Sequence, residues 1–204
     1  MPLIFKQNIN SDTQVGVWKI TETETELGEG LILSKKDQDT ILSLTLSKRR
    51  LERIVCRKIL ALLLQQNEII ITYGEHGEPL MNNLHLSFSH SGEMVAVAIS
   101  GKNPIGIDIE RVQDRIVALQ SKFMSENELS VDEIHNKEAI TRIWTAKEAV
   151  YKLFSSLPLD FKEQIFVKSD SAKIFLSDEI CSVKLRSWKI EEGQYMLSLS
   201  YPEC

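Results

Sequence analysis

The stretch Ile105-Gly106-Ile107-Asp108-Ile109-Glu110 alternates apolar residues with Gly106, Asp108 and Glu110. This period of two predicts a β-strand with one buried face. Asp108 and Glu110 then point to the same side of the strand, about 7 Å apart along the chain. The strand therefore presents a pair of carboxylates on one face.

A predicted helix downstream supplies the residues that complete this group. In Trp144-Thr145-Ala146-Lys147-Glu148-Ala149-Val150-Tyr151-Lys152, the residues Trp144, Glu148 and Lys152 are spaced i, i+4 and i+8 and form one stripe. Two carboxylates from the strand and one from the helix fit a hard divalent cation such as Mg²⁺. The alternative for these residues is a surface strand that ends in acidic residues and a routine ion pair between Glu148 and Lys152.

The composition is that of an ordinary soluble globular protein, with 204 residues of which 43% are hydrophobic and 26% charged. A formal net charge of −5 argues against broad nucleic-acid binding. The three cysteines lie far apart and form no C-x-x-C pair, which argues against a disulfide framework and a zinc site. No signal-peptide pattern is present, and no apolar run approaches the ~18 residues of a membrane span. We expect a cytoplasmic protein.

The first half of the chain predicts a strand over Val15–Thr21 and a long amphipathic helix over Ile41–Gln66. Between them, the polar run at residues 21–30 is expected to continue the strand or to form a loop. The first half of the helix is crowded with basic side chains, namely Lys48, Arg49, Arg50, Arg53, Arg57 and Lys58. Such a cluster forms either a solvated face or a phosphate-binding site, and both readings stay open for Arg49 and Arg50.

A β-hairpin is predicted over Leu84–Ser89 and Met94–Ser100, with the turn at residues 90–93. Its tip carries His90, directly after Ser89. A turn histidine is either structural or solvated, whereas a Ser-His pair followed by glycine can donate hydrogen bonds to a phosphate.

In the second half, Ser125 and Glu128 have the spacing of a capping box at the start of a helix within residues 120–134. Phe123 and Met124, just before it, either pack into the core or stand exposed as a partner contact. A helix over Lys137–Phe154 follows. Four strands are predicted after it, over Ile165–Val167, Ile174–Leu176, Ser182–Ile190 and Gln194–Ser200.

The two halves echo each other at an offset of 90 residues, since Val15-Gly16-Val17-Trp18-Lys19-Ile20 parallels Ile105–Glu110. Each half reads as strand, long helix, strands and hairpin. We therefore predict an α+β fold of two pseudo-symmetric lobes, 1–102 and 103–204, each with a long helix packed on a small, mostly antiparallel sheet. The active site is expected in the cleft between the lobes, and only the second lobe would hold metal.

These motifs together resemble the 4′-phosphopantetheinyl transferases of the larger, surfactin-synthetase-activating type. The resemblance rests on GIDIE, WTAKEAVYK, the hairpin LSFSHSGEMVAVAIS, the basic helix KRRLERIVCRKIL and the segment KFMSENEL, in that family's order. It implies transfer of the 4′-phosphopantetheine arm from coenzyme A to a serine of an apo acyl, peptidyl or polyketide carrier protein. Adenosine 3′,5′-bisphosphate would be released, and a two-lobed chain would act as a monomer.

The resemblance also implies roles for particular residues. Asp108, Glu110 and Glu148 would be the Mg²⁺ ligands, with Asp108, Glu148 and Lys152 as the catalytic residues and Glu148 as the position discussed for the general base. The residues implied in binding coenzyme A are Arg49, Arg50, Ser89, His90, Asp108, Lys147 and Lys152, with Arg50, more than Arg49, holding the 3′-phosphate. The first lobe would carry the basic residues and the Ser-His hairpin, and the second the carboxylates.

One turn departs from the family's pattern. The family often has Gly-Lys-Pro before the Ser-His hairpin, whereas this chain has Gly77-Glu78-Pro79. A carboxylate there would repel a phosphate, so that either Arg49, Arg50 or Lys36 compensates or nucleotide affinity is reduced. Two alternatives follow from these observations: a catalytically weakened coenzyme A or carrier-protein binding module, and a metal-dependent phosphoesterase.

Overall fold

A computed structural model describes residues 3–75, 77–130, 133–155 and 157–203. The chain divides into two compact units, Met1–Lys102 and Asn103–Cys204. The active site in the cleft between the lobes stays a prediction. Within the described ranges, no helix is both long and apolar enough to cross a membrane.

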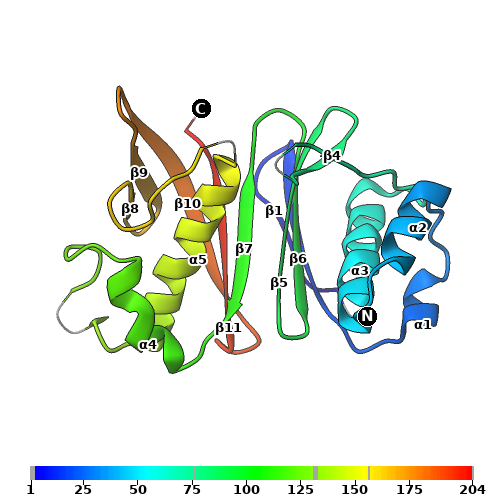
Figure 1. Ribbon diagram of the computed structural model, residues 1–204, viewed down its shortest axis with the longest axis horizontal. Helices are drawn as coiled ribbons and strands as arrows, with labels where there is room; N and C mark the ends of the chain where they lie inside the picture. The colour runs from blue at the N-terminus through cyan, green and yellow to red at the C-terminus, as the bar shows by residue number, and fades with distance from the viewer. Residues whose placement is uncertain (1–2, 76, 131–132, 156, 204) are drawn as a thin grey trace. The chain divides into compact units, whose positions relative to one another are not determined.

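The first unit is a six-stranded antiparallel sheet with three helices on one face (Figure 1). Its strand order is β1-β2-β6-β5-β4-β3. The strands are β1 (Leu3–Asn8), β2 (Thr13–Lys19), β3 (Thr72–Tyr73), β4 (Pro79–Met81), β5 (Leu84–Ser91) and β6 (Met94–Ser100). The helices are α1 (Glu24–Gly28), α2 (Lys35–Leu42) and α3 (Ser47–Leu64).

Helix α3 buries an apolar stripe, including Ile59 and Leu63, against the sheet. It ends at Leu64, and the capping residue Gln65 that follows has a left-handed φ of 55°. The prediction of one helix over Ile41–Gln66 was too long, because α2 ends at Leu42 and α3 begins only at Ser47.

The prediction of a strand or loop over residues 21–30 was wrong at its centre, where α1 forms. Thr23 and Glu26 make a complete capping box there: the Thr23 hydroxyl accepts from Glu26 N, and the Glu26 carboxylate accepts from Thr23 N. These bonds satisfy amide groups that the short helix leaves free at its start. The sheet also includes β1, which the sequence reading did not predict.

The second unit is a five-stranded antiparallel sheet of order β7-β11-β10-β9-β8, with α5 (Lys137–Leu153) across one face (Figure 1). Its strands are β7 (Gly106–Arg111), β8 (Ile165–Val167), β9 (Ser171–Phe175), β10 (Ile180–Ile190) and β11 (Tyr195–Pro202). The short helix α4 (Arg115–Leu119) and the 3₁₀ turn η1 (Gln120–Lys122) follow β7. The unit's core lies between α5 and the sheet.

Residues 126–129 form turns and bends in place of the expected helix after Ser125, and residue 133 lies in a 3₁₀ turn. Residues 131–132 of the expected helix lie outside the described residues. Half of the capping box is nevertheless present, because the Glu128 carboxylate accepts from Ser125 N at 2.8 Å. The other carboxylate oxygen of Glu128 accepts from Val167 N in β8 at 2.8 Å. Glu128 therefore ties the segment to the sheet and does not start a helix.

The two units share one topology, since the order β2-β6-β5-β4-β3 of the first matches β7-β11-β10-β9-β8 of the second. The packing matches as well. A methyl group added at Gly16 would meet Ile59 of α3, and one added at Gly106 would meet Ala149 of α5. Both pairs are related by the offset of 90 residues. The α+β fold of two similar lobes is confirmed, with β1 as an additional strand of the first.

Candidate active site

Strand β7 lies unusually close to α5, and this contact positions the carboxylates. A Cβ added to Gly106 would lie 1.9 Å from the carbonyl oxygen of Ala149 and 2.9 Å from the amide nitrogen of Leu153. Only glycine fits such an approach of two backbones. Because side chains alternate along a strand, Asp108 and Glu110 lie on the same face as Gly106, towards α5.

Asp108 and Lys152 form the central contact of this site. The Lys152 ammonium donates to Asp108 Oδ1 at 2.7 Å and to the carbonyl oxygen of Ile107 at 3.0 Å. Asp108 is buried, whereas the Lys152 side chain is 29% exposed. The pair therefore lies at the edge of the core, where the ammonium can also reach a bound anion.

Glu148 lies one turn before Lys152, on the half-exposed stripe that the sequence predicted. Burial raises the pKa of Glu148 to about 7, and the negative charges of Asp108 and Glu110 act in the same direction against the positive charge of Lys152. A carboxyl group that titrates near neutral pH can take up a proton during catalysis.

The carboxylates are close enough to influence one another, but they do not form a closed ligand set. Among the described residues, no group of three His, Cys, Asp or Glu side chains lies in a position to hold a metal ion. The donor chemistry still suits Mg²⁺, since Asp108, Glu110 and Glu148 offer only oxygen atoms. Burial is the main cause of the raised pKa of Glu148, and the repulsion between the carboxylates adds to it. A bound cation would relieve this repulsion.

Lys147, which the resemblance implied in coenzyme A binding, has a structural position instead. Its side chain is fully buried, and its ammonium lies 2.7 Å from Glu128 Oε2. It also donates to the carbonyl oxygens of Phe161 and Ile165, at 2.7 and 2.6 Å. With three acceptors inside the core, the ammonium joins α5 to the β8 region and has no surface for a nucleotide.

Small hydroxyl groups that the sequence reading overlooked fix α5 on the sheet. Thr145 Oγ1 lies 2.7 Å from Ser198 Oγ, which lies 2.9 Å from Ser187 Oγ. Ser200 Oγ donates to the carbonyl oxygen of Ala149 at 2.8 Å, at the point where Gly106 packs. These bonds fix the rotation of the helix about its own axis, and hence the direction of Glu148 and Lys152. Serine at every second position of a buried strand was the available signal.

A pocket of about 260 Å³ opens beside Glu110. Its apolar floor includes Phe123 and Trp144, whose rings are 4.9 Å apart in an edge-to-face contact. The cationic side chains of Arg111, Arg115 and Lys122 also line it. Of the two readings for Phe123 and Met124, the buried one is correct, because the two residues are only 3% and 9% exposed.

In the first unit, the start of α3 and the end of β5 bring Arg49 and His90 together. Arg49 Nη1 lies 2.7 Å from His90 Nε2 and donates to Glu52 Oε2 at 3.1 Å. Glu52 is buried, whereas Arg49 and His90 are exposed. Ser89, next to His90, is buried with its neighbours in the sheet. The structure therefore places a basic pair at the surface over a single carboxylate.

Arg50 points elsewhere. Its Nε donates to both carboxylate oxygens of Glu24 in α1, at 3.0 and 2.9 Å, and its Nη1 donates to the carbonyl oxygen of Leu44 at 2.7 Å. These bonds tie α1 and the α2–α3 link to α3. Of the two arginines expected to hold the 3′-phosphate, Arg49 is thus the one that lies beside His90.

The carboxylate of Glu78, which stands where the family often has lysine, packs against its own turn. The Glu78 side chain folds back over Gly74, where an added Cβ would lie 2.1 Å from Glu78 Oε1. Gly74 N also donates to the carbonyl oxygen of Glu78 at 3.0 Å. The carboxylate is therefore packed on its own turn.

Comparison with known proteins agrees with the geometry of the second unit. Residues 104–200 match the 4′-phosphopantetheinyl transferase superfamily. This segment contains β7 with Asp108 and Glu110, and α5 with Glu148 and Lys152. The match covers 97 of the 204 residues of the chain.

Individual relatives are described as 4′-phosphopantetheinyl transferases. The chain is 32% identical over 107 residues to the 4′-phosphopantetheinyl transferase gsp of Aneurinibacillus migulanus, covering 50% of this chain and 45% of the relative. It is 27% identical over 143 residues to Sfp of Bacillus subtilis (strain 168), covering 65% and 63%. It is 23% identical over 192 residues to ffp of Bacillus subtilis, covering 80% and 85%. The matches thus span about half to two thirds of the first two relatives.

Proposed function

We propose that this protein transfers the 4′-phosphopantetheine arm of coenzyme A to a serine of an apo carrier protein. The Asp108–Lys152 pair beside Glu148 carries the proposal, because it lies in the segment that matches the superfamily. In this reaction the serine oxygen forms a bond to the β-phosphorus of coenzyme A. The bond from that phosphorus to the bridging oxygen breaks, and its electron pair leaves with adenosine 3′,5′-bisphosphate.

Phosphoryl transfer depends mainly on positioning and on neutralisation of charge. The half-exposed Lys152 ammonium is held by Asp108 and the Ile107 carbonyl group, so it is oriented before substrate binds. It can stabilise the negative charge of the departing bisphosphate. In the metal-free protein the pKa of Glu148 is about 7, which suits a base that acts at neutral pH. A carboxylate that ligates Mg²⁺ is a weaker base, so with the ion bound a water molecule would relay the serine proton.

Asp108, Glu110 and Glu148 are the residues that would hold Mg²⁺. When bound, the ion would supply positive charge against the pyrophosphate oxygens. The buried Asp108 is fixed on β7, whereas Glu110 and Glu148 are partly exposed and can adjust to the ion. This set of three carboxylates, with only oxygen donors, supports Mg²⁺ as the bound ion.

For the nucleotide, we propose the surface pair Arg49 and His90 as the contact for a phosphate of coenzyme A, with Ser89 behind them. For the carrier protein, we propose the pocket beside Glu110. Its cationic rim of Arg111, Arg115 and Lys122 suits an acidic partner. Action as a monomer in the cytoplasm, without nucleic acid, stays a prediction.

Intact-mass spectrometry of an apo acyl carrier protein, incubated with this protein, coenzyme A and Mg²⁺, tests the proposal. We expect a mass gain of about 340 Da, the size of a phosphopantetheine arm, that EDTA abolishes. Asp108→Ala should abolish the gain, whereas Asp114→Ala, which removes an exposed carboxylate bound to Lys137, should retain it.

The same experiment separates the other two readings. Hydrolysis of coenzyme A without a carrier protein would indicate a phosphoesterase. Tight binding of coenzyme A without any transfer to several carriers would indicate a binding module. Either outcome would refute the proposed transfer.

A further inference from the structure

The sheet of the second unit has one face that points away from α5, and cationic side chains gather on its β9–β10 part. Ile174 of β9 and Val183 of β10 pack towards α5 in the core. Because side chains alternate along a strand, Lys173, Lys184 and Arg186 point to the opposite face, where all three are exposed. We name this surface the outer face, and its residues are Lys173, Phe175, Ile180, Lys184 and Arg186.

The three cations of the outer face are neighbours. Lys184 lies opposite Ser171 in the β9–β10 ladder, so Lys173 is its diagonal neighbour at about 7–8 Å. Arg186 stands two residues further along β10, about 7 Å from Lys184. Three positive charges therefore act together on whatever lies against this part of the sheet.

No carboxylate on the same strands balances these charges. The strands β8 to β11 contain no aspartate or glutamate, although the chain has 29 of them. Of the ion pairs between described residues, none includes Lys173, Lys184 or Arg186. Arg186 Nε donates to the neutral hydroxyl of Tyr201 at 3.2 Å. The outer face thus has an excess of three positive charges in a chain whose net charge is −5.

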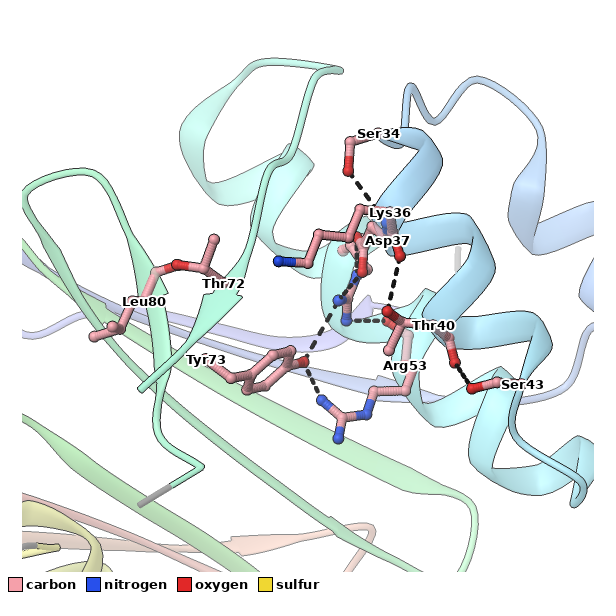
Figure 2. Close-up of polar contacts among 10 residues, drawn as sticks. Ser34, Lys36, Asp37, Thr40, Ser43, Arg53, Thr72, Tyr73 and Leu80 are labelled. Carbon is pink, nitrogen blue, oxygen red and sulfur yellow. Dashed lines mark hydrogen bonds and ion pairs between the residues drawn. The ribbon is translucent and has the colours of Figure 1, made fainter. Parts of the chain in front are cut away.

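The basic residues of α3 differ, because their charges are used inside the first unit (Figure 2). Arg57 donates to the two carboxylate oxygens of Asp37, at 2.8 and 2.6 Å. Arg53 donates to Tyr73 Oη, and its guanidinium lies 4.7 Å from the centre of that ring. These contacts tie α2 and β3 to α3. The cations of the outer face serve no such packing.

Apolar side chains border the cations of the outer face. Phe175 of β9 lies directly opposite Ile180 of β10, and the two are 42% and 63% exposed. Covering such a pair is favourable because it removes apolar surface from water. A partner that suits this face therefore presents acidic and apolar side chains next to each other.

The partner contacts the face and does not extend the sheet at β8. Val167 N of β8 already donates to Glu128, and the carbonyl oxygen of Ile165 already accepts from Lys147. Backbone groups that an added strand would need are thus occupied. Side chains on the outer face are left to make the contact.

We propose that the outer face binds an acidic amphipathic helix of a partner protein. Carboxylates at i and i+4 of a helix lie about 6 Å apart, which matches the spacing of about 7 Å between Lys184 and Arg186. Apolar residues beside those carboxylates would cover Phe175 and Ile180. A nucleic acid or an anionic membrane fits less well, because its dense negative charge is repelled by a chain with a net charge of −5.

The partner is distinct from the carrier protein of the proposed reaction. Glu148 lies on α5, and the outer face is on the other side of the sheet from that helix. A carrier protein whose serine reaches Glu148 therefore does not occupy the outer face. The proposal does not depend on the transferase activity.

Fluorescence anisotropy of a labelled peptide tests the proposal. The probe is an alanine-based helix of about 20 residues, with glutamates at i and i+4 and a leucine beside each. We expect it to bind, and we expect Lys184→Glu and Arg186→Glu each to weaken binding at least about tenfold without lowering the Tm. Lys6→Glu is the matched control, because Lys6 is an exposed strand lysine of the first unit, and it should leave binding unchanged.

Two further probes and one activity assay complete the test. The proposal is overturned if the peptide does not bind, if Lys184→Glu binds it as tightly as Lys6→Glu does, or if a peptide with glutamine at each glutamate binds equally well. Binding of oligothymidylate or phosphatidylserine vesicles in place of the peptide would overturn it in favour of a nucleic acid or a membrane. Lys184→Glu should retain carrier modification, and its loss in this variant alone would assign the face to the carrier protein and overturn the proposal. Loss of modification in every variant and in the parent would instead refute the transferase and leave the peptide result standing.

Discussion

Replacement of Gly106 by alanine tests how closely β7 must lie against α5. The added Cβ would lie 1.9 Å from the Ala149 carbonyl oxygen, and ordinary contact begins near 3.4 Å, so the two backbones would have to separate by about 1.5 Å. Neither backbone can rotate away as a side chain can. Overpacking of this kind costs about 1–3 kcal/mol of stability.

The same shift moves Asp108 and Glu110 relative to Glu148 and Lys152. A misplacement of about 1 Å in a catalytic site costs about 100-fold in rate. We therefore expect Gly106→Ala to lose about 100-fold in kcat for carrier modification, while circular dichroism still shows a folded protein with a lowered Tm.

Two control variants make the prediction specific. Gly16→Ala meets the Ile59 side chain at 2.7 Å in the first unit, so it should lower the Tm with little change in kcat. Gly28→Ala meets no atom within 4 Å and should change neither. If Gly106→Ala matched Gly28→Ala in both Tm and kcat, the close approach of β7 and α5 would be refuted.

Three further predictions follow from the described contacts. Lys147→Met should lower the free energy of unfolding by about 3–5 kcal/mol, because it leaves Glu128 buried without its cation, and chemical denaturation measures this. Adding Glu128→Gln, which removes the buried charge and keeps an acceptor for Val167 N, should restore part of the loss, which a coenzyme A contact at Lys147 would not produce. Arg49→Ala should raise the KM for coenzyme A about tenfold, because Arg49 lies beside His90. Arg50→Ala should mainly lower the Tm, because it removes the bond to Glu24. A raised KM for Arg50→Ala and a lowered Tm alone for Arg49→Ala would contradict the placement of these arginines. Glu148 must lose its proton to bind Mg²⁺, so calorimetric Mg²⁺ affinity should rise with pH through about 7, and Glu148→Gln should remove this dependence. In EDTA, the stability of the metal-free protein should depend on pH in the opposite direction. Because the pKa of Glu148 is raised in the native state, that state binds a proton more tightly than the unfolded state does, so the protein should gain stability as pH falls from above 7 towards 4.5. A stability that does not change with pH over this range would contradict the raised pKa.

The spacing of apolar residues in the sequence predicted much of the fold. Alternation predicted β7 and the β5–β6 hairpin, and helical spacing predicted α5 within one residue of its observed end. Helix α1 was missed because a run of threonine and glutamate suits a loop as well as a helix by composition. The Thr23–Glu26 capping spacing was nevertheless present in the sequence.

The positions of single charges were harder to predict. Lys147 stands next to Glu148 in the motif and was assigned to the site, although the helical period places it with Ile140, Ile143 and Val150 on the buried stripe. A lysine on a buried stripe indicates a partner in the core, but the sequence could not name Glu128, 19 residues away.

Contacts between distant segments lay beyond sequence reasoning. Arg49 meets His90 across 41 residues, and Arg50 turns to Glu24 across 26. The two arginines are neighbours in the sequence, but successive helical residues point in directions about 100° apart. Which of the two lies beside the histidine depends on how α3 is rotated on its sheet, and that rotation is a property of the folded unit.

The pairing of β7 has a consequence for synthesis of the chain. Along the described strands, β7 forms its ladder with β11, where Asp108 pairs with Ser198 and Glu110 with Met196. A ribosome that has made the GIDIE segment must add more than eighty further residues before its hydrogen-bond partner exists. Release of a nascent chain before Tyr195–Pro202 has emerged would leave the two carboxylates on a strand without a sheet. Polypeptides cut short by incomplete translation would therefore be inactive, even when they include every residue proposed for catalysis.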